Sequence, residues 1–193
     1  VQCSNKETQG AMADDVIVVE GLVKNYGTLT AVKGVSFSVH RGEVFGILGP
    51  NGAGKTTALE CIEGLLKPTA GRATVLGVDT QRDTLRVKER IGVQLQASAY
   101  FDYLTLQEIL ELFGQFYGKK LQAGALLARV GLQDKANSTV NRLSGGQKQR
   151  FTIAATLGND PEVVFLDEPT TGLDPQARRN LWYLILDIHR EGR

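Results

Sequence analysis

Short apolar runs with strand-like spacing fill the first half of the chain. Residues 16–20 (VIVVE) predict a short buried strand, and residues 35–40 alternate apolar and polar positions as a half-buried strand does. The continuous apolar run EVFGIL at 43–48 predicts another strand, followed by a helix that stops near Pro68. Further strands are expected at 73–77 and 91–96.

From about residue 98 to 146 the spacing becomes helical, with a second helical segment that ends at Gly131. Thr105 and Glu108 form a capping box at the start of the first of these helices. An apolar strand is expected at 163–169. A last amphipathic helix follows, with Asp174 as N-cap, Pro175 at its first position and Gly192 as C-cap. Its apolar positions keep a helical period: Leu181, Leu184, Ile185 and Ile188.

Composition indicates an ordinary globular chain. Its 193 residues suit one domain, or one domain with an inserted subdomain, and 42% hydrophobic with 22% charged residues suit a sizeable core. The net charge of +1 gives no argument for nucleic acid or for an acidic partner. No apolar run approaches the roughly 18 residues of a membrane helix. The sequence therefore predicts no membrane span, although the chain can still dock on a protein that has one.

The two cysteines, Cys3 and Cys61, predict no disulfide framework, which fits a reducing cytoplasm. Cys61 lies in a helical pattern and is expected to pack as a small apolar residue. The single methionine is Met12, so we expect residues 1–13 to be a leader or a disordered segment outside the fold.

A glycine-rich stretch predicts a phosphate site. GPNGAGKT at 49–56 matches G-x-x-x-x-G-K-[ST] between a predicted strand and a predicted helix. Its glycines allow backbone N–H groups to turn inward around phosphate oxygens, at the positive N-terminal end of the helix. An ordinary glycine-rich turn is the alternative. The predicted nucleotide-binding residues here are Gly49, Pro50, Asn51, Gly52, Ala53, Gly54, Lys55, Thr56 and Thr57.

Four residues of this kind of site have distinct expected roles. Lys55 would reach the β- and γ-phosphates, and Thr56 would offer its hydroxyl to Mg²⁺, which prefers oxygen ligands. Asp167 would belong to the Mg²⁺ shell at the end of a buried strand. Glu168 would position or deprotonate the attacking water. The alternative for the two acids is a solvated pair that ends a strand.

A second glycine turn occurs in RLSGGQ at 142–147. Ser144 and Gln147 form a capping box for an ordinary helix, but a cap alone does not require Gly145 and Gly146. Such glycines cost on the order of 1 kcal/mol each inside a helix, and they leave backbone N–H groups open to another molecule. A helix N-terminus with bare amides is an anion site. Two phosphate-binding faces on one chain suggest a head-to-tail dimer.

Together these motifs closely resemble the ATP-binding cassette (ABC) ATPases: Walker A at 49–57, the signature LSGGQ at 143–147 and Walker B VVFLDE at 163–168. The resemblance runs from about residue 16 to the end. It implies an α/β P-loop NTPase (RecA-like) core with an N-terminal antiparallel β subdomain. It also implies an inserted helical subdomain at about 98–146, all within one domain at 14–193. ATP and Mg²⁺ are the implied cofactors.

The resemblance adds three residues. Tyr26, in VKNYG, matches the aromatic that stacks on adenine, although a strand-end core aromatic fits the pattern as well. Gln96 matches the Q-loop glutamine better than Gln94, and would contact Mg²⁺ and the attacking water. TGLD at 171–174 resembles the D-loop, so Asp174 would touch the partner's site as well as cap its helix. The resemblance thus implies that Lys55, Gln96 and Glu168 act in catalysis, and that Thr56, Gln96 and Asp167 hold the metal.

The segment EPTTGLDPQARRNLW resembles ABC-2 type bacterial exporters of drugs, polysaccharides or lipids. This implies an ATPase that pairs with a second ATPase subunit and with membrane-spanning permease subunits, without nucleic acid, on the inner face of the cell membrane. Phe101 and Tyr103 are candidate anchors for the permease, or core residues of the helical subdomain. The alternative function is a soluble ABC-type ATPase that acts on ribosomes, DNA or cofactor assembly.

The resemblance stops short of one family feature. The family continues with a further strand and a histidine that contacts the γ-phosphate, whereas this sequence ends at Arg193, and His189 lies in the last predicted helix. We therefore expect a C-terminally truncated domain that binds nucleotide better than it hydrolyses it.

Overall fold

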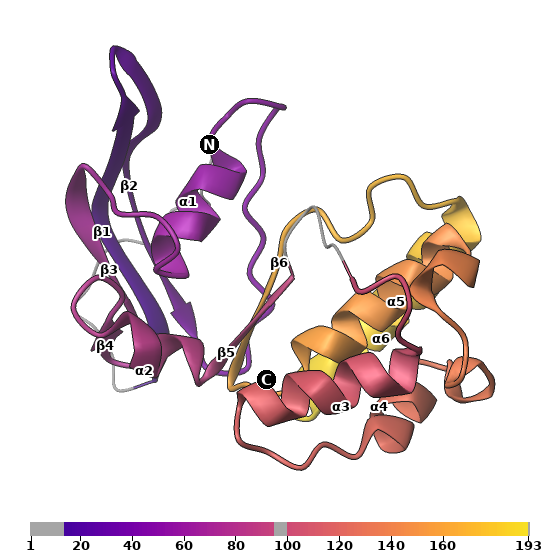
Figure 1. Cartoon of the computed structure of the whole chain (residues 1–193). Coiled ribbons are helices and arrows are strands. Elements are labelled where there is room, and N and C mark those ends of the chain that lie inside the picture. Colours follow the sequence, from indigo (N-terminus) through magenta and orange to yellow (C-terminus); the bar gives the residue numbers. More distant parts are fainter. Residues whose placement is uncertain (1–13, 95–99, 193) are drawn as a thin grey trace. The chain divides into compact units, whose positions relative to one another are not determined.

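A computed structural model describes residues 14–94 and 100–192. The expectations for residues 1–13 and for Gln96 lie outside these described residues. The described chain forms two compact units, which we call the first unit (residues 14–88) and the second unit (residues 89–191) (Figure 1).

A four-stranded antiparallel sheet forms the first unit. The spatial order is β2-β1-β3-β4, with β1 (Asp15–Tyr26), β2 (Leu29–His40), β3 (Ala70–Val75) and β4 (Val78–Asp79). The strands predicted at 16–20 and 35–40 are confirmed, and both are longer than expected. Their extensions form the long hairpin of Figure 1.

Irregularities in the β1–β2 pairing decide which side chains face the core. Ile17 and Val19 are buried, and a register shift after Val19 brings Leu22 to the buried side as well. Further along, Lys24 pairs with Val32 while Asn25 pairs with Thr30, so the residue between them on β2 has no partner in the pairing. This is the pattern of a β-bulge.

Helix α1 (Lys55–Ile62) packs on this sheet through Ala58, Cys61 and Ile62, all of which are buried. This confirms the expected packing of Cys61. The helix ends at Ile62, earlier than the predicted stop near Pro68. Gly64 has φ 73°, its N–H donates to Cys61 O at 3.3 Å, and the next N–H donates to Glu60 O at 2.9 Å. This Schellman arrangement ends the helix six residues before the proline. The short α2 (Thr84–Lys88) follows β4.

The prediction of a strand at 43–48 is wrong. A strand needs a neighbour for its backbone hydrogen bonds, and within residues 14–94 and 100–192 the run contains only an isolated β-bridge at Leu48 and no strand. The apolar side chains of this run have other surroundings. Phe45 stacks on Phe37 of β2, with ring centroids 4.9 Å apart, while Val44 and Leu48 are exposed.

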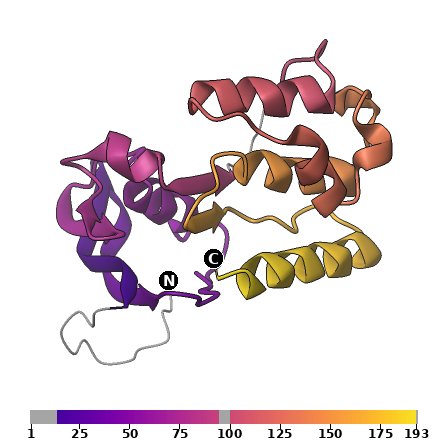
Figure 2. The ribbon, with the colours of Figure 1, turned by 90° about the horizontal axis from the view of Figure 1, so that it is seen from below.

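The second unit combines a parallel strand pair with helices. The pair is β5 (Ile91–Gln94) and β6 (Val163–Leu166). The helices are α3 (Leu106–Phe116), α4 (Ala123–Arg129), α5 (Gly145–Thr156) and α6 (Pro175–Arg190), with the 3-10 turns η1 (Gln133–Lys135) and η2 (Val140–Arg142). Their apolar faces share one core, and α5 and α6 lie side by side (Figure 2).

Helix ends in the second unit agree with the sequence patterns. Both halves of the capping box at α3 form: Glu108 N–H donates to Thr105 Oγ1 at 3.3 Å, and Thr105 N–H donates to Glu108 Oε2 at 2.8 Å. Asp174 caps α6 by accepting two N–H bonds at 2.9 Å, and Gly192, with φ 88°, follows its last turn. The four apolar positions predicted for α6 are all buried. Helix α4 ends two residues before Gly131. None of the described helices is long and apolar enough to cross a bilayer.

Candidate nucleotide-binding site

The glycine-rich loop at 49–54 leads directly into α1. Gly54 is the N-cap of this helix with φ 83°, a left-handed conformation that side chains disfavour. A Cβ at Gly54 would also overlap the carbonyl of Ala31, the unpaired residue of the β2 bulge. The fold of the first unit therefore requires glycine at this position. The loop is closed by a turn in which Ala53 N–H donates to Pro50 O at 3.1 Å.

Lys55 curls back over its own loop. Its Nζ donates to the carbonyls of Gly49 at 3.1 Å and of Pro50 at 3.2 Å. Thr56 and Thr57 complete the first turn of α1, and like Lys55 they are half-buried. The loop thus places an ammonium group next to the positive end of a helix, an arrangement suited to an anion.

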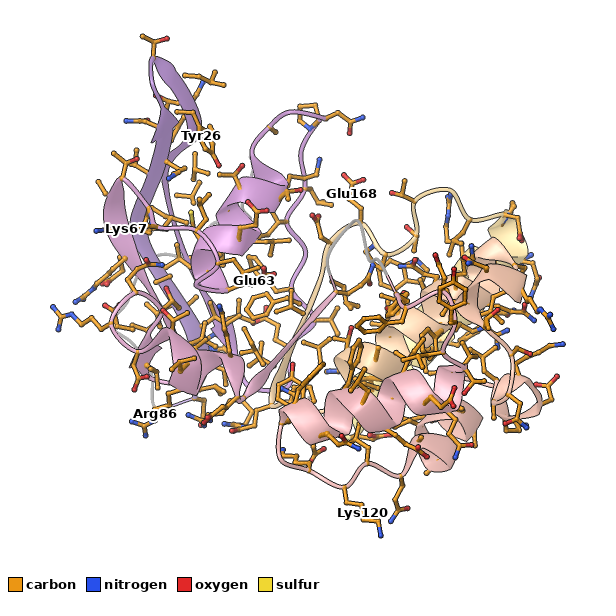
Figure 3. All side chains as sticks on the ribbon, in the orientation of Figure 1. Tyr26, Glu63, Lys67, Arg86, Lys120 and Glu168 are labelled. Carbon is orange, nitrogen blue, oxygen red and sulfur yellow. The ribbon has the colours of Figure 1, made fainter. Side chains whose placement is uncertain are left out.

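Tyr26 belongs to the same unit as this loop. It is the last residue of β1, on the hairpin (Figure 3), and its side chain is 47% exposed. The alternative that Tyr26 is a core aromatic is therefore wrong for the described chain.

The two acids follow β6 in the second unit. Asp167 is buried, and its N–H donates to Gln94 O at 3.3 Å, which extends the β5–β6 pairing. Glu168, labelled in Figure 3, is half-buried and has φ 47°. A left-handed backbone costs a residue with a side chain roughly 1–2 kcal/mol. This strain redirects the chain directly after Asp167, so the two neighbouring acids have different exposures.

Thr171 forms two hydrogen bonds with Glu168 that the sequence patterns did not predict. Its N–H donates to Glu168 O at 3.1 Å, and its Oγ1 donates to Glu168 Oε2 at 3.1 Å. The hydroxyl thus holds the carboxylate over a four-residue turn. The only signal in the sequence was the threonine three residues after the acid, a spacing that a turn brings together.

The signature stretch caps α5 as predicted. Gln147 N–H donates to Ser144 Oγ at 3.3 Å, and Ser144 N–H donates to Gln147 Oε1 at 2.9 Å. The two glycines between them differ. A Cβ at Gly146 would lie 3.0 Å from the Cβ of Ala177 in α6, whereas a Cβ at Gly145 would meet nothing within 4 Å among the described residues. Packing explains Gly146 but not Gly145.

The same packing brings the signature stretch close to the D-loop residue. Ala177, which lies against Gly146, donates its N–H to Asp174 at 2.9 Å. The N-terminal ends of α5 and α6 therefore lie together in the second unit.

The predicted site residues fall into two groups. Tyr26 and residues 49–57 lie in the first unit, while the signature residues, the two acids and Asp174 lie in the second. The less favoured Q-loop candidate, Gln94, is buried in β5, and its Oε1 has no hydrogen-bond partner among the described residues. The oxygens of Thr56 and Asp167 are of the type that Mg²⁺ prefers.

The chain is similar in sequence to known proteins. The model of the ABC transporter family matches residues 32–171. "Nod factor export ATP-binding protein I" of Ralstonia nicotianae is 42% identical over 190 residues, which are 95% of this chain and 59% of that protein. "Daunorubicin resistance ATP-binding protein DrrA3" of Streptomyces coeruleorubidus is 45% identical over 176 residues, which are 89% of this chain and 56% of that protein. The chain thus spans less than two thirds of the length of these relatives.

Solved structures agree with the fold. The structure of cbiO1 from Clostridium perfringens, described as part of the ABC transporter complex cbiONQ, has a TM-score of 0.82 and 31% identity over 93% of this chain and 75% of that one. An ATP-binding cassette of another ABC transporter has a TM-score of 0.82 and 27% identity over 92% of this chain and 78% of that one. These likenesses confirm the predicted P-loop NTPase fold class. The chain belongs to the ABC transporter family of ATP-binding proteins, as its three motifs predicted.

Proposed function

We propose that this chain is the ATP-binding and ATP-hydrolysing part of a subunit that powers an ABC membrane exporter. The observation that carries the proposal is the loop at 49–54, where Gly54 is required by close approach and the Lys55 ammonium is held over the loop by two carbonyls. Phosphate oxygens would replace these carbonyls as acceptors for Lys55 and would also accept bonds from the loop N–H groups.

Hydrolysis would use the residues after β6. Bound Mg²⁺ would neutralise phosphate charge, held by Thr56, Asp167 and Gln96. Glu168, positioned by Thr171, would accept a hydrogen bond from the attacking water and take its proton. Gln96 would also contact this water. Tyr26 would stack on the adenine.

The second phosphate-binding face would act on a partner chain. In a head-to-tail dimer, Ser144 and the amides of Gly145 and Gly146 would reach the γ-phosphate of an ATP held by the partner's loop, with Gln147 beside them. The open space at Gly145 supports this role, because nothing within the described chain explains it. Asp174 would touch the partner's site from the neighbouring helix end.

We propose further that the chain pairs with membrane-spanning permease subunits at the inner face of the membrane. Closing and reopening of the ATP-bound dimer would be transmitted to these subunits. Phe101 and Tyr103 are 54% and 95% exposed, which supports the role of anchors over that of core residues. The relative named for Nod factor export favours an exporter over other transport directions.

Binding of Mg–ATP tests the proposal. Lys55→Ala should weaken it about 10- to 100-fold, because hydrogen bonds to charged groups contribute roughly 1.5–3 kcal/mol. The matched control is Lys33→Ala, which removes an exposed lysine from β2 of the same unit and should leave the affinity unchanged. Equal affinities for the two variants would contradict the proposal.

Co-purification with a membrane-spanning protein in detergent would support export, whereas co-sedimentation with ribosomes or DNA would support the soluble alternative.

A further inference from the structure

Lys24 lies two residues before Tyr26 on β1, and its side chain leaves the strand on the same face. Successive side chains of a strand alternate between faces, so Leu22, Lys24 and Tyr26 share one side. The register shifts in this part of the hairpin fall on β2 and leave β1 regular. Leu22 is fully buried, so this is the core side of the first unit.

Two contacts fix the Lys24 ammonium. Its Nζ lies over the Tyr26 ring, 5.2 Å from the centroid, within the roughly 6 Å at which a cation is attracted to an aromatic face. The same Nζ donates to the carbonyl of Lys67 at 2.8 Å. Tyr26 and Lys67 are labelled in Figure 3. The ammonium therefore joins the ring to the segment between α1 and β3.

That segment is itself held to the end of β1. Thr69 N–H donates to Val23 O at 2.8 Å, and Asn25 N–H donates to Thr69 Oγ1 at 2.9 Å. The carbonyl that holds Lys24 is thus part of a fixed structure.

Lys24 also lies close to α1, the helix that begins at the glycine-rich loop. Burial raises the pKa of the Cys61 thiol in this helix, and the positive charge of Lys24 opposes the increase.

We propose that Lys24 is a positioning residue for the nucleotide base, because it holds the Tyr26 ring by one face and leaves the other face for the purine. The proposal rests on the proposed binding of ATP. A ring that is already oriented loses less conformational entropy when a base stacks on it. A half-exposed ring at a strand end would otherwise sample several rotamers.

A role as a plain structural tether makes a different prediction. If Lys24 only tied the 67–69 segment to β1, its loss would disturb α1 and the glycine-rich loop. Every phosphate ligand would then bind more weakly. If Lys24 acts through the ring, the effect depends on the presence of a base.

The experiment compares Mg–ATP with inorganic triphosphate plus Mg²⁺ by titration calorimetry. Lys24→Met should weaken the affinity for Mg–ATP about two- to fivefold, the size of an exposed cation–π contact, and leave triphosphate binding unchanged. Lys24→Arg should retain the affinity for Mg–ATP because it keeps the cation. Lys33→Met, on β2 of the same hairpin, is the matched control and should change neither affinity.

A double-mutant cycle tests whether Lys24 acts through the ring. In a Tyr26→Leu background, Lys24→Met should have no further effect on the affinity for Mg–ATP. Should Lys24→Met fail to fold, Lys24→Gln serves instead, since its amide can still donate to Lys67 O but carries no charge.

Three results would overturn the inference: an unchanged affinity of Lys24→Met for Mg–ATP, an equal loss for both ligands, or additive effects with Tyr26→Leu. If the unsubstituted chain does not bind Mg–ATP, the proposed function fails, and the inference fails with it. Binding by the unsubstituted chain together with any of the three results contradicts the inference alone.

Discussion

Glu168 differs from its neighbour Asp167 in both backbone and surroundings. Asp167 is buried at the end of β6, while Glu168 has a left-handed backbone and a carboxylate that accepts a hydrogen bond from Thr171 Oγ1 at 3.1 Å. Strained backbone of this kind is found where the rest of the structure determines it, often at functional sites. This difference supports the proposed division, in which Asp167 would bind the metal and Glu168 would activate the water.

Replacing Glu168 by Gln tests this division. The amide oxygen can still accept the bond from Thr171, so the turn and the binding of Mg–ATP should be preserved. Turnover should fall by about 10²- to 10⁴-fold, the usual contribution of a general base. Phosphate release and Mg–ATP affinity are measured on the same preparation, and normal phosphate release by the variant would contradict the role given to Glu168.

Helix α5 begins with two glycines that the fold treats differently. Gly146 lies against Ala177 of α6, so a methyl group there would have to displace a packed neighbour. Gly145 has open space around its Cβ direction among the described residues. One glycine is thus explained within the chain, and the other only by a molecule that approaches the helix end.

Alanine substitutions separate these two reasons. Gly145→Ala should leave the free energy of unfolding unchanged or raise it by up to about 1 kcal/mol, the helix propensity difference. Gly146→Ala should be less stable than Gly145→Ala by about 1–3 kcal/mol, the usual cost of overpacking. Urea unfolding measures both. Gly145→Ala should nevertheless weaken ATP-dependent dimerisation. A Gly145→Ala variant that dimerises like the unsubstituted chain would remove the functional reason for this glycine.

The start of α3 gives a pH-dependent prediction. The backbone N–H of Thr105, with its hydroxyl, lowers the pKa of Glu108 below its ordinary value of 4.5. A carboxylate with a lowered folded pKa stabilises the fold above its unfolded pKa, and this contribution is lost as the pH falls through the folded pKa. Glu108→Ala should therefore be less stable than the unsubstituted chain at pH 7, and the difference should shrink below pH ~4.5. A difference independent of pH, in urea unfolding from pH 7 down to about pH 3, would exclude the charge of Glu108 as its cause.

Local chemistry explains which elements were predictable. The starts of α3, α5 and α6 follow from caps at Thr105, Ser144 and Asp174, because each cap involves residues within three positions of one another. Pro68 predicts a later end for α1 than the structure has, because Gly64 with its left-handed backbone already ends the helix. The apolar pattern of the run 43–48 predicts a strand, yet strand formation depends on a distant partner that such a pattern does not specify.

The sequence likewise predicts which residues belong to the candidate site, but not their detailed geometry. The motif residues were identified from spacing, whereas the positive φ of Glu168, its bond from Thr171 and the contact of Lys24 with Tyr26 depend on turns and on side-chain directions. The exposure of Tyr26 and Tyr103 likewise decided between core and surface only once the packing of each unit was known.

For the molecule as a whole, the glycine-rich loop belongs to the first unit and the signature stretch to the second. A head-to-tail pair of chains would bring the second unit of one copy against the first unit of the other. The net charge of +1 adds little long-range repulsion between copies. ATP bound between them would then hold the pair together, and its hydrolysis would release it.

Ser144→Arg tests this assembly in a Glu168→Gln background that retains ATP. The bulky cation should spare the binding of Mg–ATP to single chains but block dimerisation in sedimentation velocity. Loss of the N-cap costs about 1 kcal/mol, so Ser144→Ala, which loses the same cap, is the control for stability. Ser144→Thr keeps a capping hydroxyl and should still form dimers with Mg–ATP. If Ser144→Arg dimerises as well as Ser144→Thr, the signature stretch is only a helix cap, and the dimer must form through another surface.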